Sequence, residues 1–202
     1  MKHSDWNARY AACDLVWGKE PNAFVALELK DRKALGRALD LACGEGRNAI
    51  WLAERGWKVS AVDFSDVALE RGARLAAGRG VGVEWLCEDL TQWEPPLGAF
   101  ELVLISYLQV PGDDRREVLA RAAAALAPGG ELLMIGHARR NLSEGVGGPR
   151  DPAVLWTPVE IAAELEKLGL CVERCEHVER AVETPEGVQA AFDVLARAKR
   201  RT

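Results

Sequence analysis

The sequence predicts an α/β fold with one mostly parallel sheet of seven strands and helices on both of its faces. Two observations carry this prediction. Short apolar runs alternate along the chain with stretches of helical periodicity, and strands that alternate with helices pair in parallel through crossover helices. The last two apolar runs, 170–178 and 188–198, have no helix-length connection between them, so they are expected to pair antiparallel as a C-terminal hairpin.

The individual elements follow from apolar runs, caps and stops. The strands are expected at 37–42, 58–62, 83–87, 100–105, 131–136, 170–178 and 188–198, and the helices at 48–55, 65–77, 113–126 and 158–168. Ser65 is a typical N-cap, and Asp113 or Asp114 is expected to cap the third helix. Thr157-Pro158 has the residue types of an N-cap and a first helical position.

Composition and charge exclude several classes of protein. The chain has 202 residues, 49% of them hydrophobic and 28% charged, which is the composition of a globular domain. Its net charge of −5 is unfavourable for binding the phosphates of nucleic acids. No apolar run reaches the ~18 residues that a membrane span needs. We therefore expect one domain over 1–202, with neither nucleic acid nor membrane as a partner.

The five cysteines are an odd number, which favours reduced thiols and a cytoplasmic protein. Cys171, Cys175 and His177 would supply at most part of a zinc site, and their segment is predicted to be a strand. No metal is therefore expected.

The strongest chemical signal is the run from Leu39 to Asn48, where a predicted strand leads into Gly44-Glu45-Gly46 and then a helix. Glycines let the backbone turn sharply and approach a ligand closely, because they have no Cβ. Asp63 ends the next strand, so an acid suited to ribose hydroxyls lies beside the glycine loop. This arrangement predicts a nucleoside-binding site at the carboxyl ends of the strands.

These motifs resemble those of class I S-adenosylmethionine-dependent methyltransferases, which implies a Rossmann-like fold. Asp40-x3-Gly44-x-Gly46 matches the first family motif, and Val62-Asp63-Phe64-Ser65 matches the second. Cys87-Glu88-Asp89-Leu90 matches the third, and the runs 100–107 and 126–133 match the fourth strand and the turn into the fifth. The resemblance covers about residues 36–198, the expected core. Asn48 stands where many members have a third glycine.

The resemblance implies S-adenosyl-L-methionine as cofactor and S-adenosyl-L-homocysteine as its product. It implies a cofactor site made of residues from the strand ends and the N-terminal segment: Tyr10, Trp17, Asp40, Ala42, Gly44, Gly46, Arg47, Asn48, Asp63, Phe64, Ser65, Glu88, Asp89, Leu90, Ser106 and Gln109.

The N-terminal segment 1–30 is similar to the lid of small-molecule methyltransferases of the tellurite-resistance and thiopurine type, through Trp6-Asn7-x2-Tyr10 and Trp17-Gly18-x2-Pro21-Asn22. A lid would exclude water from the transfer. The alternative is that Trp6, Tyr10 and Trp17 only pack a helix against the sheet.

Substrate groups are expected after the fourth and fifth strands. His137 and Tyr107 are the candidate catalytic residues, since imidazole exchanges protons near neutrality. Arg139, Arg140 and Asn141 are candidates for holding an anionic substrate. The alternatives are a structural histidine and a solvated arginine pair.

The predicted function is therefore methyl transfer to a small molecule with a thiol, a metalloid oxyanion or a related acceptor, by a monomer or homodimer. One alternative is a non-catalytic module that binds S-adenosylmethionine and acts through a partner. A nicotinamide-dependent oxidoreductase is a further alternative, but it normally needs a third glycine, and Asp40 would repel its pyrophosphate.

Overall fold

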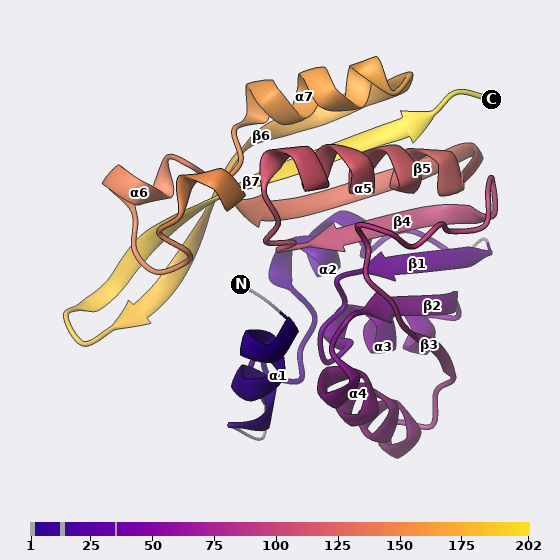
Figure 1. Ribbon diagram of the computed structural model, residues 1–202, viewed down its shortest axis with the longest axis horizontal. Helices are drawn as coiled ribbons and strands as arrows, with labels where there is room; N and C mark the ends of the chain where they lie inside the picture. The colour runs from indigo at the N-terminus through magenta and orange to yellow at the C-terminus, as the bar shows by residue number, and fades with distance from the viewer. Residues whose placement is uncertain (1–2, 13–14, 35) are drawn as a thin grey trace.

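The computed structural model describes residues 3–12, 15–34 and 36–202, so Cys13 and parts of the segment 1–30 lie outside it (Figure 1). Seven strands form one sheet in the order β3-β2-β1-β4-β5-β7-β6. Their bounds are β1 (Arg37–Leu41), β2 (Lys58–Asp63), β3 (Val83–Cys87), β4 (Phe100–Ser106), β5 (Leu126–His137), β6 (Leu170–Thr184) and β7 (Gly187–Arg200). The first five pair in parallel, and β7 runs antiparallel to both β5 and β6. The predicted fold is confirmed.

Helices cover both faces of this sheet. The helices α2 (Ala23–Leu29), α3 (Arg47–Glu54) and α4 (Asp66–Gly78) pack on one face, and α5 (Gly112–Ala125) and α7 (Pro158–Lys167) pack on the other. The apolar residues between the layers form two cores, because each strand sends alternate side chains to opposite faces. The helix α1 (His3–Ala11) lies on α4 through Trp6 and Tyr10.

Several boundaries differ from the expected ones. Ser65 and Thr157 cap their helices as predicted, but Pro111 holds the N-cap position of α5, and Asp113 and Asp114 lie in its first turn. The strand β5 begins at Leu126, because the chain enters it directly from α5 across a register shift opposite β4. The helix α2 was not predicted, and β6 extends well beyond the expected end at 178.

The loop expected at 141–152 carries the short helix α6 (Asn141–Glu144) and ends at a 3₁₀ turn, Pro152–Val154. No helix in the described part of the chain is both long and apolar enough to cross a membrane. The described residues also contain no group of three or more His, Cys, Asp or Glu placed to hold a metal ion.

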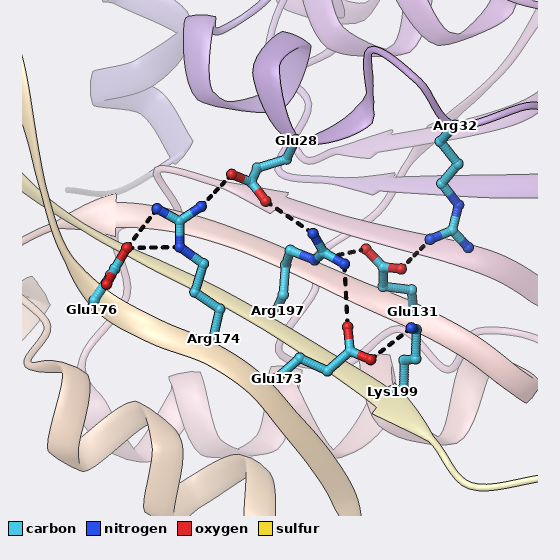
Figure 2. A network of polar contacts seen from close by, with 8 residues as sticks. All are labelled: Glu28, Arg32, Glu131, Glu173, Arg174, Glu176, Arg197 and Lys199. Carbon is cyan, nitrogen blue, oxygen red and sulfur yellow. Dashed lines mark hydrogen bonds and ion pairs between the residues drawn. The ribbon is translucent and has the colours of Figure 1, made fainter.

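A network of ion pairs attaches α2 to the C-terminal half of the sheet (Figure 2). Its members are Glu28, Arg32, Glu131, Glu173, Arg174, Glu176, Arg197 and Lys199. Glu28 on α2 accepts from Arg174 of β6 at 2.5 Å and from Arg197 of β7 at 3.2 Å. Glu131 on β5 pairs with Arg32, which follows α2, and with Arg197. The network therefore fixes the segment that leads from the N-terminus into β1.

Candidate cofactor and substrate site

A cavity of about 360 Å³ opens at the carboxyl ends of the parallel strands. Its volume lies in the range of small-molecule sites, and parallel sheets bind ligands at this edge. The lining comes from the N-terminal segment and from the ends of β1, β2, β4, β5 and β6: Trp6, Tyr10, Trp17, Pro21, Asn22, Ala23, Ala42, Cys43, Gly44, Arg47, Asn48, Asp63, Phe64, Ser106, Tyr107, Leu108, Gln109, Val110, His137 and Arg180.

The glycine loop and Asp63 form one wall of the cavity. The backbone N–H of Gly44 donates to Asp63 Oδ2 at 2.8 Å, and that of Ser65 donates to Oδ1 at 2.9 Å. Gly44 has a φ of +55°, and a Cβ there would lie 2.7 Å from the hydroxyl oxygen of Tyr10. A side chain at this position would crowd Tyr10, and the positive φ favours glycine, so a loop that permits close approach lies beside the acid that ends β2.

Asp40 lies beneath this wall. Its side chain is fully buried and neither carboxyl oxygen meets the geometry of a hydrogen bond, although the backbone N–H of Ala49 and the charge of Arg47 act to lower its pKa. Burial, together with the charge of Asp63, raises the pKa of Asp40 to about 8. A buried acid without a partner is stabilised by a cationic ligand. Asp40 therefore fits a cofactor that carries ammonium and sulfonium groups.

The N-terminal segment forms the second wall. Trp6 stacks on Tyr10 with ring centroids 5.8 Å apart, and the indole N–H of Trp17 donates to the Tyr10 hydroxyl at 3.3 Å. Arg47 donates to the carbonyl of Trp17 at 3.0 Å. Asn48 accepts the backbone N–H of Asn22 at 2.8 Å, so two of the predicted cofactor residues also hold this segment.

The third wall is polar. The hydroxyl of Tyr107 donates to Asp193 Oδ2 at 2.7 Å, and Arg180 Nε donates to the same oxygen at 3.0 Å. His137 Nδ1 lies 3.2 Å from the other oxygen, Oδ1, and the His137 and Tyr107 rings are 4.6 Å apart. Asp193 is fully buried on β7 directly opposite His137 on β5. The amide of Asn22 reaches the Tyr107 hydroxyl at 3.5 Å.

Opposing effects act on the ionisable groups of this wall. Burial alone would raise the pKa of Asp193, but hydrogen bonds from His137 and Tyr107 and the charge of Arg180 outweigh it and leave the pKa below its ordinary value. Burial and the Asp193 carboxylate raise the pKa of Tyr107. Asp193 is therefore a carboxylate and Tyr107 a neutral phenol near neutral pH.

Other predicted cofactor residues, the buried Asp40 among them, lie outside the cavity lining. A Cβ on Gly46 would lie 2.3 Å from the ring of Trp85, so Gly46 faces β3 rather than the cavity. Ser65 caps α4, and Leu90 is buried in the core. Glu88 and Asp89 are exposed, and Asp89 accepts from Thr91.

The three predicted substrate residues also lie outside the lining. Arg139 and Arg140 form surface ion pairs with Glu160 at 3.3 Å and Glu144 at 2.7 Å. The buried Asn141 side chain donates to the carbonyl of Gly147 at 2.9 Å and accepts from the backbone of Phe192. These contacts position the loop after β5.

The sequence analysis missed Asn22, Arg180 and Asp193. Asp193 carried one signal, since it is the only acid in the apolar run 188–196. A buried strand tolerates a carboxylate only where the carboxylate is paired.

Comparison with known proteins agrees with this geometry. Residues 38–130 match the family described as methyltransferase domain. A demethylmenaquinone methyltransferase from Thermus thermophilus is 36% identical over 124 residues, which are 60% of this chain and 54% of that protein. A ribosomal RNA small subunit methyltransferase C from Alcanivorax borkumensis is 30% identical over 50% of this chain and 32% of that protein. The matches thus span about half or less of these relatives.

The fold also matches solved structures. One, described by the conversion of a disulfide bond into a thioacetal group during echinomycin biosynthesis, has a TM-score of 0.78 at 21% identity and covers 98% of this chain and 92% of its own. The chain therefore has a Rossmann-like fold, and its residues 38–130 are similar to the methyltransferase domain of that family.

Proposed function

We propose that this chain transfers the methyl group of S-adenosylmethionine to a small molecule held in the 360 Å³ cavity. The observation that carries the proposal is that one cavity is lined both by the glycine loop with Asp63 and by the polar wall of Tyr107, His137 and Arg180. A nucleoside site and a site for a second molecule are thereby continuous.

The residues at the glycine loop and at the N-terminal segment have separate roles in this proposal. Asp63 accepts the ribose hydroxyls, Gly44 lets the methionine part approach the backbone, and Asp40 lies near its positive charge. When bound, the cofactor supplies an activated methyl group on a cationic sulfur. Tyr10 and Trp17 cover the cavity and exclude water, so the acceptor need only be held in line with that methyl group.

A small acceptor is favoured over RNA. The net charge is −5, and the cavity is covered by the aromatic N-terminal segment, whereas RNA binding requires an open basic surface. The Trp6 and Trp17 motifs resemble those of small-molecule enzymes of the tellurite-resistance and thiopurine type, which supports a small acceptor. We expect a cytoplasmic protein that acts as a monomer or homodimer.

The test is a panel of thiols, metalloid oxyanions and phenols incubated with S-adenosylmethionine and scored for release of S-adenosylhomocysteine. We expect release with at least one class of small acceptor and none with RNA. Tight binding of S-adenosylhomocysteine without turnover of any acceptor would instead indicate a binding module that acts through a partner.

A further inference from the structure

The polar wall of the cavity contains a carboxylate that orients a histidine. Asp193 is fully buried and its pKa is lowered, so it is ionised and can only accept hydrogen bonds. At 3.2 Å from Asp193 Oδ1, His137 Nδ1 must therefore be the protonated nitrogen. In neutral imidazole the other nitrogen, Nε2, is then an acceptor without a proton.

Tyr107 and Arg180 bind the same carboxylate. Tyr107 has a φ of +59°, an uncommon conformation for a non-glycine residue, and its backbone N–H donates to the carbonyl of Ile135 at 2.7 Å. Its raised pKa keeps the phenol neutral, so it positions Asp193 and does not act as a base. Arg180 uses its Nε–H on Asp193, and a guanidinium has further N–H donors on its terminal nitrogens.

His137 and Arg180 lie side by side at the cavity, since one binds Oδ1 and the other Oδ2 of the same carboxylate. A base beside a fixed cation is suited to an acceptor that must lose a proton and pass through an oxyanion. A metalloid oxyanion has no need of such a base, and a thiol has little need of one because thiols ionise more readily than phenols.

We propose that the acceptor is a small molecule with a hydroxyl group, that His137 removes the hydroxyl proton, and that Asp193 and Arg180 are the positioning and charge-stabilising groups. The inference rests on the proposed function. The hydroxyl proton passes to His137 Nε2 while the oxygen bonds to the methyl carbon. The carbon–sulfur bond breaks with its electron pair remaining on sulfur, and the proton leaves His137 to solvent after the products dissociate.

A comparison of two phenols tests the base. At pH 8 a nitrophenol is largely ionised, whereas 4-methylphenol is not. His137→Gln should lower turnover of 4-methylphenol by about 10²–10⁴-fold and turnover of the nitrophenol by less than about tenfold. His177→Gln, which changes an exposed histidine on β6, is the control and should change neither rate. Equal losses on both phenols would overturn the assignment.

Asp193→Asn tests positioning. The variant should lower kcat for 4-methylphenol with little change in KM. When it is combined with His137→Gln, kcat should fall almost no further than in His137→Gln alone, because the two residues act as one unit. A multiplicative loss in the double variant would overturn the role of Asp193. Turnover of thiols or oxyanions without turnover of any phenol would overturn the hydroxyl acceptor.

A third readout requires no acceptor. The chain has three histidines, so the ¹⁵N resonances of His137 can be assigned by comparison with His137→Gln. In the neutral imidazole we expect the proton on Nδ1 and none on Nε2, and the opposite tautomer would overturn the proposal. Failure to bind S-adenosylhomocysteine would contradict the proposed function alone, because the tautomer is set by Asp193 whether or not ligand is bound.

Discussion

Glu45 and Arg71 form an ion pair of 2.6 Å beneath the N-terminal segment, with the Glu45 side chain only 2% exposed. The second oxygen of Glu45 accepts the backbone N–H groups of Val16 at 2.9 Å and Trp17 at 3.3 Å, and Arg71 donates to the carbonyl of Tyr10 at 2.9 Å. Glu45, the residue between the two loop glycines, therefore holds the N-terminal segment that lines the cavity.

Glu45→Gln should loosen this segment, because the carboxylate is exchanged for an amide with a single acceptor oxygen. We expect faster hydrogen exchange at Val16 and Trp17 and a loss of about 1–3 kcal/mol in the free energy of unfolding. Turnover should fall further than the folded fraction does, since water then reaches the cavity. Glu70→Gln, which weakens an exposed pair with Arg74 on α4, the helix that carries Arg71, is the control. Unchanged exchange at Val16 and Trp17 would argue that the segment only packs against the sheet.

The network around Glu28 should contribute to stability (Figure 2). Glu28 is 6% exposed and holds Arg174 and Arg197, which are 39% and 29% exposed, so solvent screens part of the interaction. Glu28→Gln should lower the free energy of unfolding, measured by urea denaturation, by about 1–2 kcal/mol, a value that allows for this screening.

Glu176→Gln is the matched control for this network, because Glu176 also binds Arg174 but is 53% exposed. It should change stability by less than about 0.5 kcal/mol. Equal losses in the two variants would mean that burial of Glu28 contributes nothing.

Asp40 should make stability depend on pH. Its pKa is about 8 in the folded state and near 3.8 otherwise, so between these values the folded state binds more protons than the unfolded state. The free energy of unfolding contributed by this group therefore falls as pH rises from about 4 to 8. Asp40→Asn should be more stable than the parent above pH 8 by at least about 1.4 kcal/mol, the value of one pKa unit.

The measurement for Asp40 is urea denaturation of both proteins at several pH values. The advantage of Asp40→Asn should grow with pH across this window and disappear near pH 4. The variant should also bind S-adenosylhomocysteine more weakly, because its side chain no longer balances the ammonium group. A stability difference that is the same at every pH would contradict the account.

The sheet could be predicted because its signals are local. Apolar runs mark all seven strands, and Ser65 and Thr157 act as the caps that their residue types indicate. The helix α2 was not predicted because a segment of seven residues is too short to show a clear helical periodicity. The extension of β6 beyond residue 178 was not predicted because this part of the strand is largely exposed, so no apolar run marks it.

The part of the cavity lining that follows strand ends could be predicted from the sequence, and Tyr10 and Trp17 were predicted from the resemblance of their motifs. Gly44 and Asp63 lie at adjacent ends of parallel strands, and the sequence places both. Asp193 lies 56 residues beyond His137 and meets it only through antiparallel register, which depends on the whole hairpin. Gly46 was placed against the cofactor because its spacing fits the motif, whereas its missing Cβ accommodates Trp85.

Calorimetric titration with S-adenosylhomocysteine tests the central claim most directly, namely that the cavity lined by Gly44 and Asp63 binds this nucleoside. We expect one site per chain, with the affinity reduced by roughly 1.5–3 kcal/mol in Asp63→Ala, since charged hydrogen bonds have this strength. Glu166→Ala, exposed on α7, is the control, and thermal unfolding checks that Asp63→Ala remains folded after losing the acceptor for Gly44 and Ser65. No binding by the parent protein, or equal affinity in a folded Asp63→Ala variant, would contradict the account.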